Sequence, residues 1–265
     1  MIVEDQLNTR QICDVIGRYD ASGGFHKSDY ERISNIKSDQ RADIADFILS
    51  FFQKSGPIRI LTMPGKHWFF ETRILERHKN TQIVGLEKSV SIFHTSGMAM
   101  PDAAYQVKSR RVGFLRHKIC EYGTGHYQYY RSSTNTETRE RSNRLLNMDF
   151  STYSTTLFSN YRATIQQKEK FHEKFLRRNS AWLDFTSGFC SEVDTGIRHI
   201  AHCMCSSDKE KPIVITLMYG RDIGGGLEGR KNHLEQLCPS IRVLSDSIYI
   251  GSNGCPMVTF YCVCL

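Results

Sequence analysis

From residue 57 onward, short apolar runs rich in β-branched residues alternate with longer segments whose apolar residues recur at helical spacing. That alternation is typical of βα units and predicts a mostly parallel sheet. The predicted strands are Ile58 to Met63, Gln82 to Glu87, Arg144 to Phe150, Ala181 to Phe185, Pro212 to Tyr219, Ile241 to Ile250 and Pro256 to Leu265. The predicted helices are Trp68 to His78, Thr155 to Arg178, Asp194 to Cys205 and Gly229 to Leu237.

The last two predicted strands are joined by a short link that contains two glycines, Gly251-Ser252-Asn253-Gly254. Such a link between two strand-like runs indicates a β-hairpin, so these two strands should be antiparallel. We therefore predict an α/β fold with a seven-stranded, mostly parallel open sheet. It should carry a C-terminal antiparallel hairpin and have helices on both faces.

The first 56 residues differ from the rest and are predicted to form a helical N-terminal extension. Within them, Ser38 to Lys54 has apolar residues at near-helical spacing, and Ser38 or Asp39 can serve as the N-cap. Gly56-Pro57 then ends the helix. The sequence thus predicts an extension of residues 1–56 and an α/β domain of residues 57–265, with a basic insertion at about 96–143.

The apolar content, 40% of the chain, is ordinary for a globular protein. No apolar run approaches the ~18 residues that a membrane span needs, and the first residues, MIVEDQLNTR, do not resemble a secretion signal. We therefore expect a soluble protein in the cytoplasm, without a membrane partner.

The nine cysteines are an odd number and form no regular disulfide framework. In a chain long enough to build a core, this favours reduced thiols in a reducing, intracellular compartment. The nearest approach to a metal cluster is His199, His202, Cys203 and Cys205. Their spacing does not match the usual paired zinc ligands, so we predict no metal site.

The chain carries a net charge of +7, and much of it is concentrated in the predicted insertion and just after it. The cations there are Lys108, Arg110, Arg111, Arg116, Lys118, Arg131, Arg139, Arg141 and Arg144, and Tyr122, Tyr127, Tyr129 and Tyr130 lie among them. Cations pair with phosphates and aromatic rings stack on bases, so the segment suits nucleic acid. A solvated insertion without a ligand has the same composition.

A parallel βα series closed by an antiparallel hairpin resembles the class I S-adenosylmethionine-dependent methyltransferases. The resemblance covers residues 57–265 and implies a cofactor lying across the carboxyl ends of the strands. The first strand is followed by Pro64 and Gly65, where the backbone would approach the cofactor closely. The family usually has an acidic residue and several glycines in this turn, and this chain keeps only Gly65. An ordinary strand-to-helix turn is the alternative.

The ends of the second and third predicted strands supply the other candidate cofactor residues. Glu87 ends the second strand, where an acidic residue can accept both ribose hydroxyls. The resemblance implies that Asp149 takes the adenine amino group and that Phe150 packs on the ring. The alternatives are an exposed Glu87, and an Asp149 that caps a turn beside a core Phe150.

Asp184 ends the fourth predicted strand, at the position that faces the transferred methyl group in such enzymes. It is the candidate catalytic residue, and an Asp that caps the next helix is the alternative. The following residues, Phe-Thr-Ser, are not the Pro-Pro-aromatic motif of enzymes that methylate nucleic-acid amino groups. Arg221 lies after the fifth strand in a glycine-rich loop and joins Arg110, Arg111 and Tyr129 as a candidate substrate-binding residue.

These features predict a methyltransferase that uses S-adenosylmethionine and acts on nucleic acid, either RNA or DNA. One alternative is a catalytically inactive, methyltransferase-like module that binds nucleic acid or a protein partner. A nicotinamide-dependent oxidoreductase is a second alternative, although the sequence lacks its glycine fingerprint.

Overall fold

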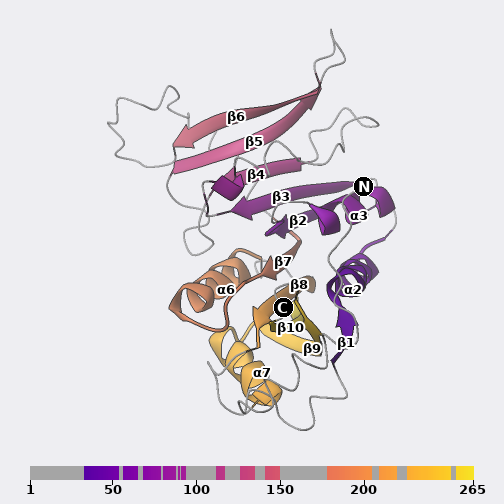
Figure 1. Cartoon of the computed structure of the whole chain (residues 1–265), viewed down its shortest axis with the longest axis vertical. Helices are drawn as coiled ribbons and strands as arrows, with labels where there is room; N and C mark the ends of the chain where they lie inside the picture. Colours follow the sequence, from indigo (N-terminus) through magenta and orange to yellow (C-terminus); the bar gives the residue numbers. More distant parts are fainter. Residues whose placement is uncertain are drawn as a thin grey trace. The chain divides into compact units, whose positions relative to one another are not determined.

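The computed structural model describes residues 33–53, 56–64, 68–78, 80–87, 89, 91–93, 112–116, 126–134, 141–149, 178–204, 209–219, 226–251 and 255–265 (Figure 1). The chain falls into two compact units. Unit 1 comprises Met1–Phe51, Trp182–Ala201 and Cys205–Leu265, and unit 2 comprises Phe52–Ala181 and His202–Met204. Strand β7 therefore starts in unit 2 and ends in unit 1.

Unit 1 is an α/β unit whose strands lie in the order β1-β9-β10-β8-β7. Its strands are β1 (Ile33–Ile36), β7 (Ser180–Asp184), β8 (Lys211–Met218), β9 (Ile241–Ile250) and β10 (Pro256–Cys264). Its helices are α2 (Lys37–Ser50), α6 (Ser191–Met204) and α7 (Gly226–Leu237). Strand β10 is antiparallel to both β9 and β8, which confirms the predicted hairpin. Figure 1 shows α6 and α7 on one side of these strands and α2 on the other.

Strands β8 and β10 form the centre of the unit 1 core. All nine residues of β10 are buried, as are the six inner residues of β8. A strand covered on both faces has no solvent side, so its sequence is continuously apolar rather than alternating. This explains why both strands were recognisable in the sequence as unbroken runs.

Helix α2 is fixed to the sheet of unit 1 by apolar and polar contacts. Ile44 and Ile48 are fully buried. Gln40, also buried, donates a hydrogen bond to the Tyr261 hydroxyl and accepts one from the Ser247 hydroxyl at 3.0 Å. Burial raises the pKa of Tyr261, so the phenol stays protonated as a partner for Gln40. The predicted helix from Ser38 is therefore confirmed, and its buried face is anchored to β9 and β10.

Unit 2 has the strand order β2-β3-β4-β5-β6. Its elements are β2 (Ile58–Thr62), α3 (Phe69–Arg77), β3 (Thr81–Glu87), β4 (Val112–Arg116), β5 (His126–Thr134) and β6 (Arg141–Asp149). Strands β2, β3 and β4 are parallel, and β4, β5 and β6 form an antiparallel meander. For β1, β4, β5 and β6, the structure describes the backbone and the register of strand pairing alone.

The third predicted strand requires a correction. Residues 144–150 were expected to continue the parallel series, but β6 pairs antiparallel with β5. The strand that pairs with β3 is β4, which the sequence analysis had placed inside the insertion. The prediction was wrong because an apolar run shows that a strand exists but does not show which strand it pairs with.

Two further elements complete the comparison with the predicted fold. Strand β1 pairs in parallel with β9, so the segment expected to be a helical extension also contributes a strand. The predicted helix Thr155 to Arg178 lies outside the described residues, except for its last residue. The domain boundary at residue 56 stays a prediction.

None of the helices that the structure describes combines the length and apolarity that crossing a bilayer requires.

The cysteines depart in one place from the expected reduced state. Cys264 is disulfide-bonded, and its partner lies outside the described residues. The described cysteines with free thiols are Cys190, Cys203, Cys238, Cys255 and Cys262. Burial raises the pKa of the Cys262 thiol far above its usual value, which makes it a poor nucleophile. The prediction that every thiol is reduced is therefore wrong at Cys264.

Candidate functional site

In unit 2, the candidate cofactor turn begins where β2 ends. Thr62, the last residue of β2, is fully buried, and its hydroxyl has no hydrogen-bond partner among the described residues. Pro64 follows and is half-buried, whereas Gly65 lies outside the described residues. A buried hydroxyl without a partner costs free energy unless a ligand or water satisfies it. The strand therefore ends in a buried hydroxyl without a hydrogen-bond partner among the described residues, a feature that the sequence does not reveal.

Trp68 holds an unusual backbone conformation at the start of α3. Its φ of 56° and ψ of 32° are left-handed, and it is the sole described residue other than glycine with positive φ. Its side chain is fully buried, and its carbonyl accepts a hydrogen bond from the Thr72 N–H at 2.9 Å. Such a conformation costs on the order of 1–3 kcal/mol and is often found at ligand sites. In this turn a tryptophan adopts a geometry that usually requires glycine.

Glu87 lies at the same edge of the unit 2 sheet. Strands β2 and β3 are parallel neighbours, and Thr62 lies level with Gly85, two residues before Glu87. One carboxylate oxygen, Oε1, accepts the Ser89 backbone N–H at 2.7 Å. That bond orients the side chain, and a carboxylate retains further lone pairs for other donors. The structure thus brings the Pro64 turn and Glu87 to adjacent strand ends, and their role at a cofactor stays a prediction.

Asp149 ends β6, three strands away from β3. Because β6 runs antiparallel to β5 and β5 antiparallel to β4, Asp149 lies at the same edge as Glu87. Three interstrand spacings separate the two strands by about 14 Å. Its predicted role at the adenine remains untested, and Phe150 lies outside the described residues.

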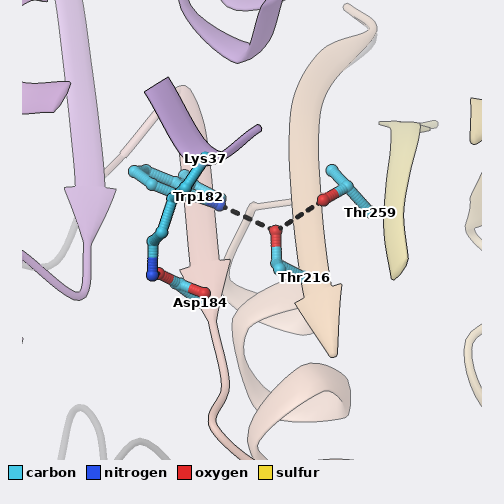
Figure 2. A network of polar contacts seen from close by, with 5 residues as sticks. All are labelled: Lys37, Trp182, Asp184, Thr216 and Thr259. Atoms are coloured by element: carbon cyan, nitrogen blue, oxygen red, sulfur yellow. Dashed lines mark hydrogen bonds and ion pairs between the residues drawn. The ribbon is translucent and has the colours of Figure 1, made fainter. Parts of the chain in front are cut away.

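In unit 1, Asp184 ends β7, and its carboxylate faces a cation (Figure 2). Lys37, the first residue of α2, has its Nζ 3.6 Å from Asp184 Oδ2, and their side chains are 29% and 16% exposed. Asp184 does not cap the next helix, because α6 begins seven residues later at Ser191. If Asp184 is not catalytic, its role in the fold is therefore an ion pair with Lys37 and not the helix cap that the sequence left open.

The surroundings of Asp184 include a buried tyrosine on β9. Burial raises the pKa of Tyr249 well above its usual value, and the negative charge of Asp184 raises it further. Tyr249 therefore stays protonated at neutral pH. Asp184 therefore interacts electrostatically with a cation on α2 and with a neutral phenol on β9.

A chain of buried hydrogen bonds lies close to Asp184 (Figure 2). Trp182 donates its indole N–H to the Thr216 hydroxyl at 3.1 Å, and Thr216 shares a hydrogen bond of 3.0 Å with Thr259. The three residues lie on β7, β8 and β10, and both threonines are fully buried. These hydrogen bonds join three strands of unit 1 close to the end of β7 that carries Asp184.

Replacing Thr216 by Val is expected to lower the free energy of unfolding by about 1–3 kcal/mol. Val keeps the shape of Thr but cannot accept the Trp182 N–H. Urea unfolding followed by the fluorescence of the two tryptophans would measure the loss. Thr259→Val removes only the outer hydrogen bond and should cost less; an equal or larger cost for Thr259→Val would contradict this account.

The candidate substrate-binding residues are only partly described. Tyr129 lies on β5, level with Leu115 of β4 and Leu146 of β6. Arg110, Arg111 and Arg221 lie outside the described residues. Gly226, the last glycine of the predicted loop, begins α7 with a φ of 60°, a conformation that glycine adopts without strain.

The sequence and the fold were also compared with known proteins. No family model matches the sequence, and no curated protein matches it either. Among solved structures, magnesium protoporphyrin IX methyltransferase from Synechocystis PCC 6803, with bound SAM, is similar at a TM-score of 0.50 and 9% identity. The alignment covers 99% of this chain and 100% of that one.

Two further structures show weaker similarity. A SAM-dependent methyltransferase from Aquifex aeolicus is similar at a TM-score of 0.45 and 10% identity, with 87% of this chain and 94% of that chain covered. An N-methyltransferase from Bradyrhizobium japonicum WM9 is similar at 0.43 and 7%, with 85% and 95% covered. At 9% identity, the similarity to the Synechocystis structure shows the architecture alone. The chain has the fold seen in the class I S-adenosylmethionine-dependent methyltransferases.

Proposed function

We propose that this protein is an S-adenosylmethionine-dependent methyltransferase that acts on nucleic acid. The observation that carries the proposal is the strand edge of unit 2, where the Pro64 turn and Glu87 end adjacent parallel strands. A structure with the same fold was solved with SAM bound. Methyl transfer from a sulfonium needs little more than in-line positioning of nucleophile and methyl carbon, so a sparse set of polar residues is sufficient.

A correspondence with the seven strands of the family is part of the proposal. We propose that β2, β3, β4, β7, β8, β9 and β10 are those strands, with β1, β5 and β6 as additions. The third strand is then β4 instead of the run that ends at Asp149. This assignment makes the β5–β6 hairpin an elaboration inserted between the third and fourth strands.

The proposed roles follow the positions of the residues. Pro64 and Gly65 bring the backbone close to the methionine part of the cofactor, and Glu87 accepts the ribose hydroxyls. Asp149 and Phe150 remain candidates for the adenine. Asp184 contacts the methyl acceptor, and Arg110, Arg111, Tyr129 and Arg221 bind the substrate.

Calorimetric titration with S-adenosylmethionine and S-adenosylhomocysteine, with NAD as the control ligand, tests the cofactor assignment. Saturable binding of either sulfur compound without NAD binding supports a methyltransferase. Binding of NAD alone would indicate a nicotinamide-dependent enzyme. No binding by folded protein would favour the inactive binding module, which the glycine-poor first turn also favours.

Glu87→Ala should weaken S-adenosylmethionine binding by about 1–3 kcal/mol, because two ribose hydroxyls lose a charged acceptor. This corresponds to a roughly 5- to 150-fold higher Kd in the same titration. Glu76→Ala is a matched control, since Glu76 lies on α3 in the same unit and is exposed. An unchanged Kd for folded Glu87→Ala protein would remove Glu87 from the cofactor site.

A further inference from the structure

The register of the β4–β6 meander places two arginines directly opposite each other. Arg131 of β5 is the partner of Arg144 of β6, and Gly113 of β4 is the partner of Arg131 on the other side. Residues directly opposite on antiparallel strands have Cβ atoms about 4.5–5.5 Å apart, and like charges there are destabilising. This row of the meander therefore consists of one glycine and two arginines.

The remaining positions on this face are aromatic, apolar or small. Because strand residues alternate between faces, every second residue shares a face, and the register extends that assignment across the three strands. The positions on the face of Arg131 and Arg144 are Gly113, Leu115, Tyr127, Tyr129, Arg131, Ser133, Ser142, Arg144, Leu146 and Met148. We call this set the Arg131 face. Among the positions of the three described strands it contains two cations, two tyrosines and no aspartate or glutamate.

The opposite face of the meander has a different charge arrangement. It carries Arg116 and Arg141, which are not level with each other: Arg116 is level with Gln128 and Arg141 with Thr134. Arg116 is also the register partner of Glu87 on β3, which has the opposite charge. The two faces thus hold the same number of arginines, but only the Arg131 face holds them as a like-charged pair.

We infer that the Arg131 face binds single-stranded nucleic acid. A phosphate bound between Arg131 and Arg144 would offset their repulsion. The two tyrosines are two residues apart on one strand and would stack on successive bases, a contact that any base can make. The inference rests on the proposed function in that it names the surface that holds the methyl acceptor. It commits to single strands, because unpaired bases are the ones that can stack on side chains.

The test compares two double variants that change the net charge equally on opposite faces of the same strands. Anisotropy of a labelled single-stranded RNA of mixed sequence would be measured with wild type, R131Q/R144Q and R116Q/R141Q across a salt series. R131Q/R144Q should weaken binding by about 10- to 30-fold at 0.1 M salt and reduce the log–log salt slope by about 1.4, the value for two lost phosphate contacts. R116Q/R141Q should change affinity less than about threefold.

Tyr129→Leu adds a measurement independent of charge. It should weaken RNA binding at least fivefold while leaving the salt slope unchanged, because stacking is lost and no phosphate contact is removed. Circular dichroism and thermal melting would establish that each variant is folded.

The inference would be overturned by equal losses in the two double variants, by tighter binding of duplex than of single-stranded RNA, or by competition from polyglutamate as effective as that from unlabelled RNA. Equal losses would show that net charge alone governs binding. Single-stranded DNA of the same sequence should bind similarly, because the contacts proposed are to phosphates and base faces; failure of DNA to bind would also contradict these contacts.

The result can be separated from the proposed enzymatic function. R131Q/R144Q should bind S-adenosylmethionine with the wild-type Kd, because neither arginine lies at the candidate cofactor turn. Wild-type protein that binds RNA through this face but no sulfur cofactor would refute the methyltransferase and leave the face intact. If the wild-type protein binds the cofactor and R131Q/R144Q loses no RNA affinity, the Arg131 face is refuted as the RNA-binding surface and the methyltransferase proposal stands.

Discussion

Asp184→Asn should slow methyl transfer about 100- to 10,000-fold. The amide oxygen can still accept a hydrogen bond, but the amide cannot take a proton from the group that receives the methyl. Transfer of labelled methyl from S-adenosylmethionine to RNA or DNA would measure the rate. The Kd for the cofactor should stay within about twofold of wild type, since Asp184 is assigned to the substrate and not to the cofactor. A purely structural role would instead lower stability and leave the rate per folded molecule unchanged.

Lys37→Met is the matching control for the ion pair. It removes the cation 3.6 Å from Asp184 and keeps most of the side-chain length. Part-exposed ion pairs contribute little, so stability should change by less than about 1 kcal/mol. If Lys37→Met and Asp184→Asn slow the reaction equally, the ion pair rather than the carboxylate itself would be what the reaction requires.

Arg230→Ala should lower the free energy of unfolding by about 2–4 kcal/mol. The guanidinium carbon lies 4.3 Å from the centre of the Tyr219 ring, and Nη1 donates to the Gly226 carbonyl at 2.9 Å. Both side chains are buried. A desolvated cation–π contact is worth about 2 kcal/mol and a charged hydrogen bond about 1.5–3 kcal/mol, and the two are not additive. Denaturant unfolding would measure the loss.

The control for Arg230 is another arginine of unit 1 that lies at the surface. Arg242 on β9 pairs with Glu210 at 3.0 Å, but their side chains are 54% and 49% exposed. Arg242→Ala should therefore cost less than about 1 kcal/mol. Comparable losses for the two arginines would mean that Tyr219 and Gly226 do not hold Arg230 as described.

Strands that are covered on both faces were predicted well from the sequence. The runs that became β2, β3, β8 and β10 are mostly apolar, because few residues of a strand covered on both faces meet water. The closing hairpin followed from its link, which contains two glycines. Composition and periodicity were therefore sufficient for the fold class and for the elements at its centre.

Strand pairing was less accessible. Strand β4, Val112–Arg116, is short and lies among cations, whereas Leu145 and Leu146 made β6 the more conspicuous run. Main-chain hydrogen bonds can form between any two strands, so they do not select the partner. Contacts between side chains of neighbouring strands make that choice, and the sequence of one strand does not show them. Four-residue β1 was missed for a related reason, since a segment as short as Ile33–Ile36 shows no period.

Some features of the candidate site could be recognised in the sequence and others could not. Glu87 and Asp184 were identified because they end apolar runs, a position visible in the sequence. The left-handed backbone of Trp68 was invisible, since a tryptophan gives no indication of positive φ. The partner of Asp184 was also invisible, because Lys37 lies in another element and only the folded chain brings the two together.

The central place of β10 determines when unit 1 can fold during synthesis. Gln40 and Tyr261, which join α2 to β10, are 221 residues apart. At 5–20 residues per second, the ribosome needs roughly 11–44 s to make the second after the first. During that interval the apolar face of α2 lacks the strands that bury it, whereas the segment 52–181 of unit 2 is synthesised without interruption. Nascent chains halted before Pro256 should therefore bind chaperones through α2, and release should follow completion of β10.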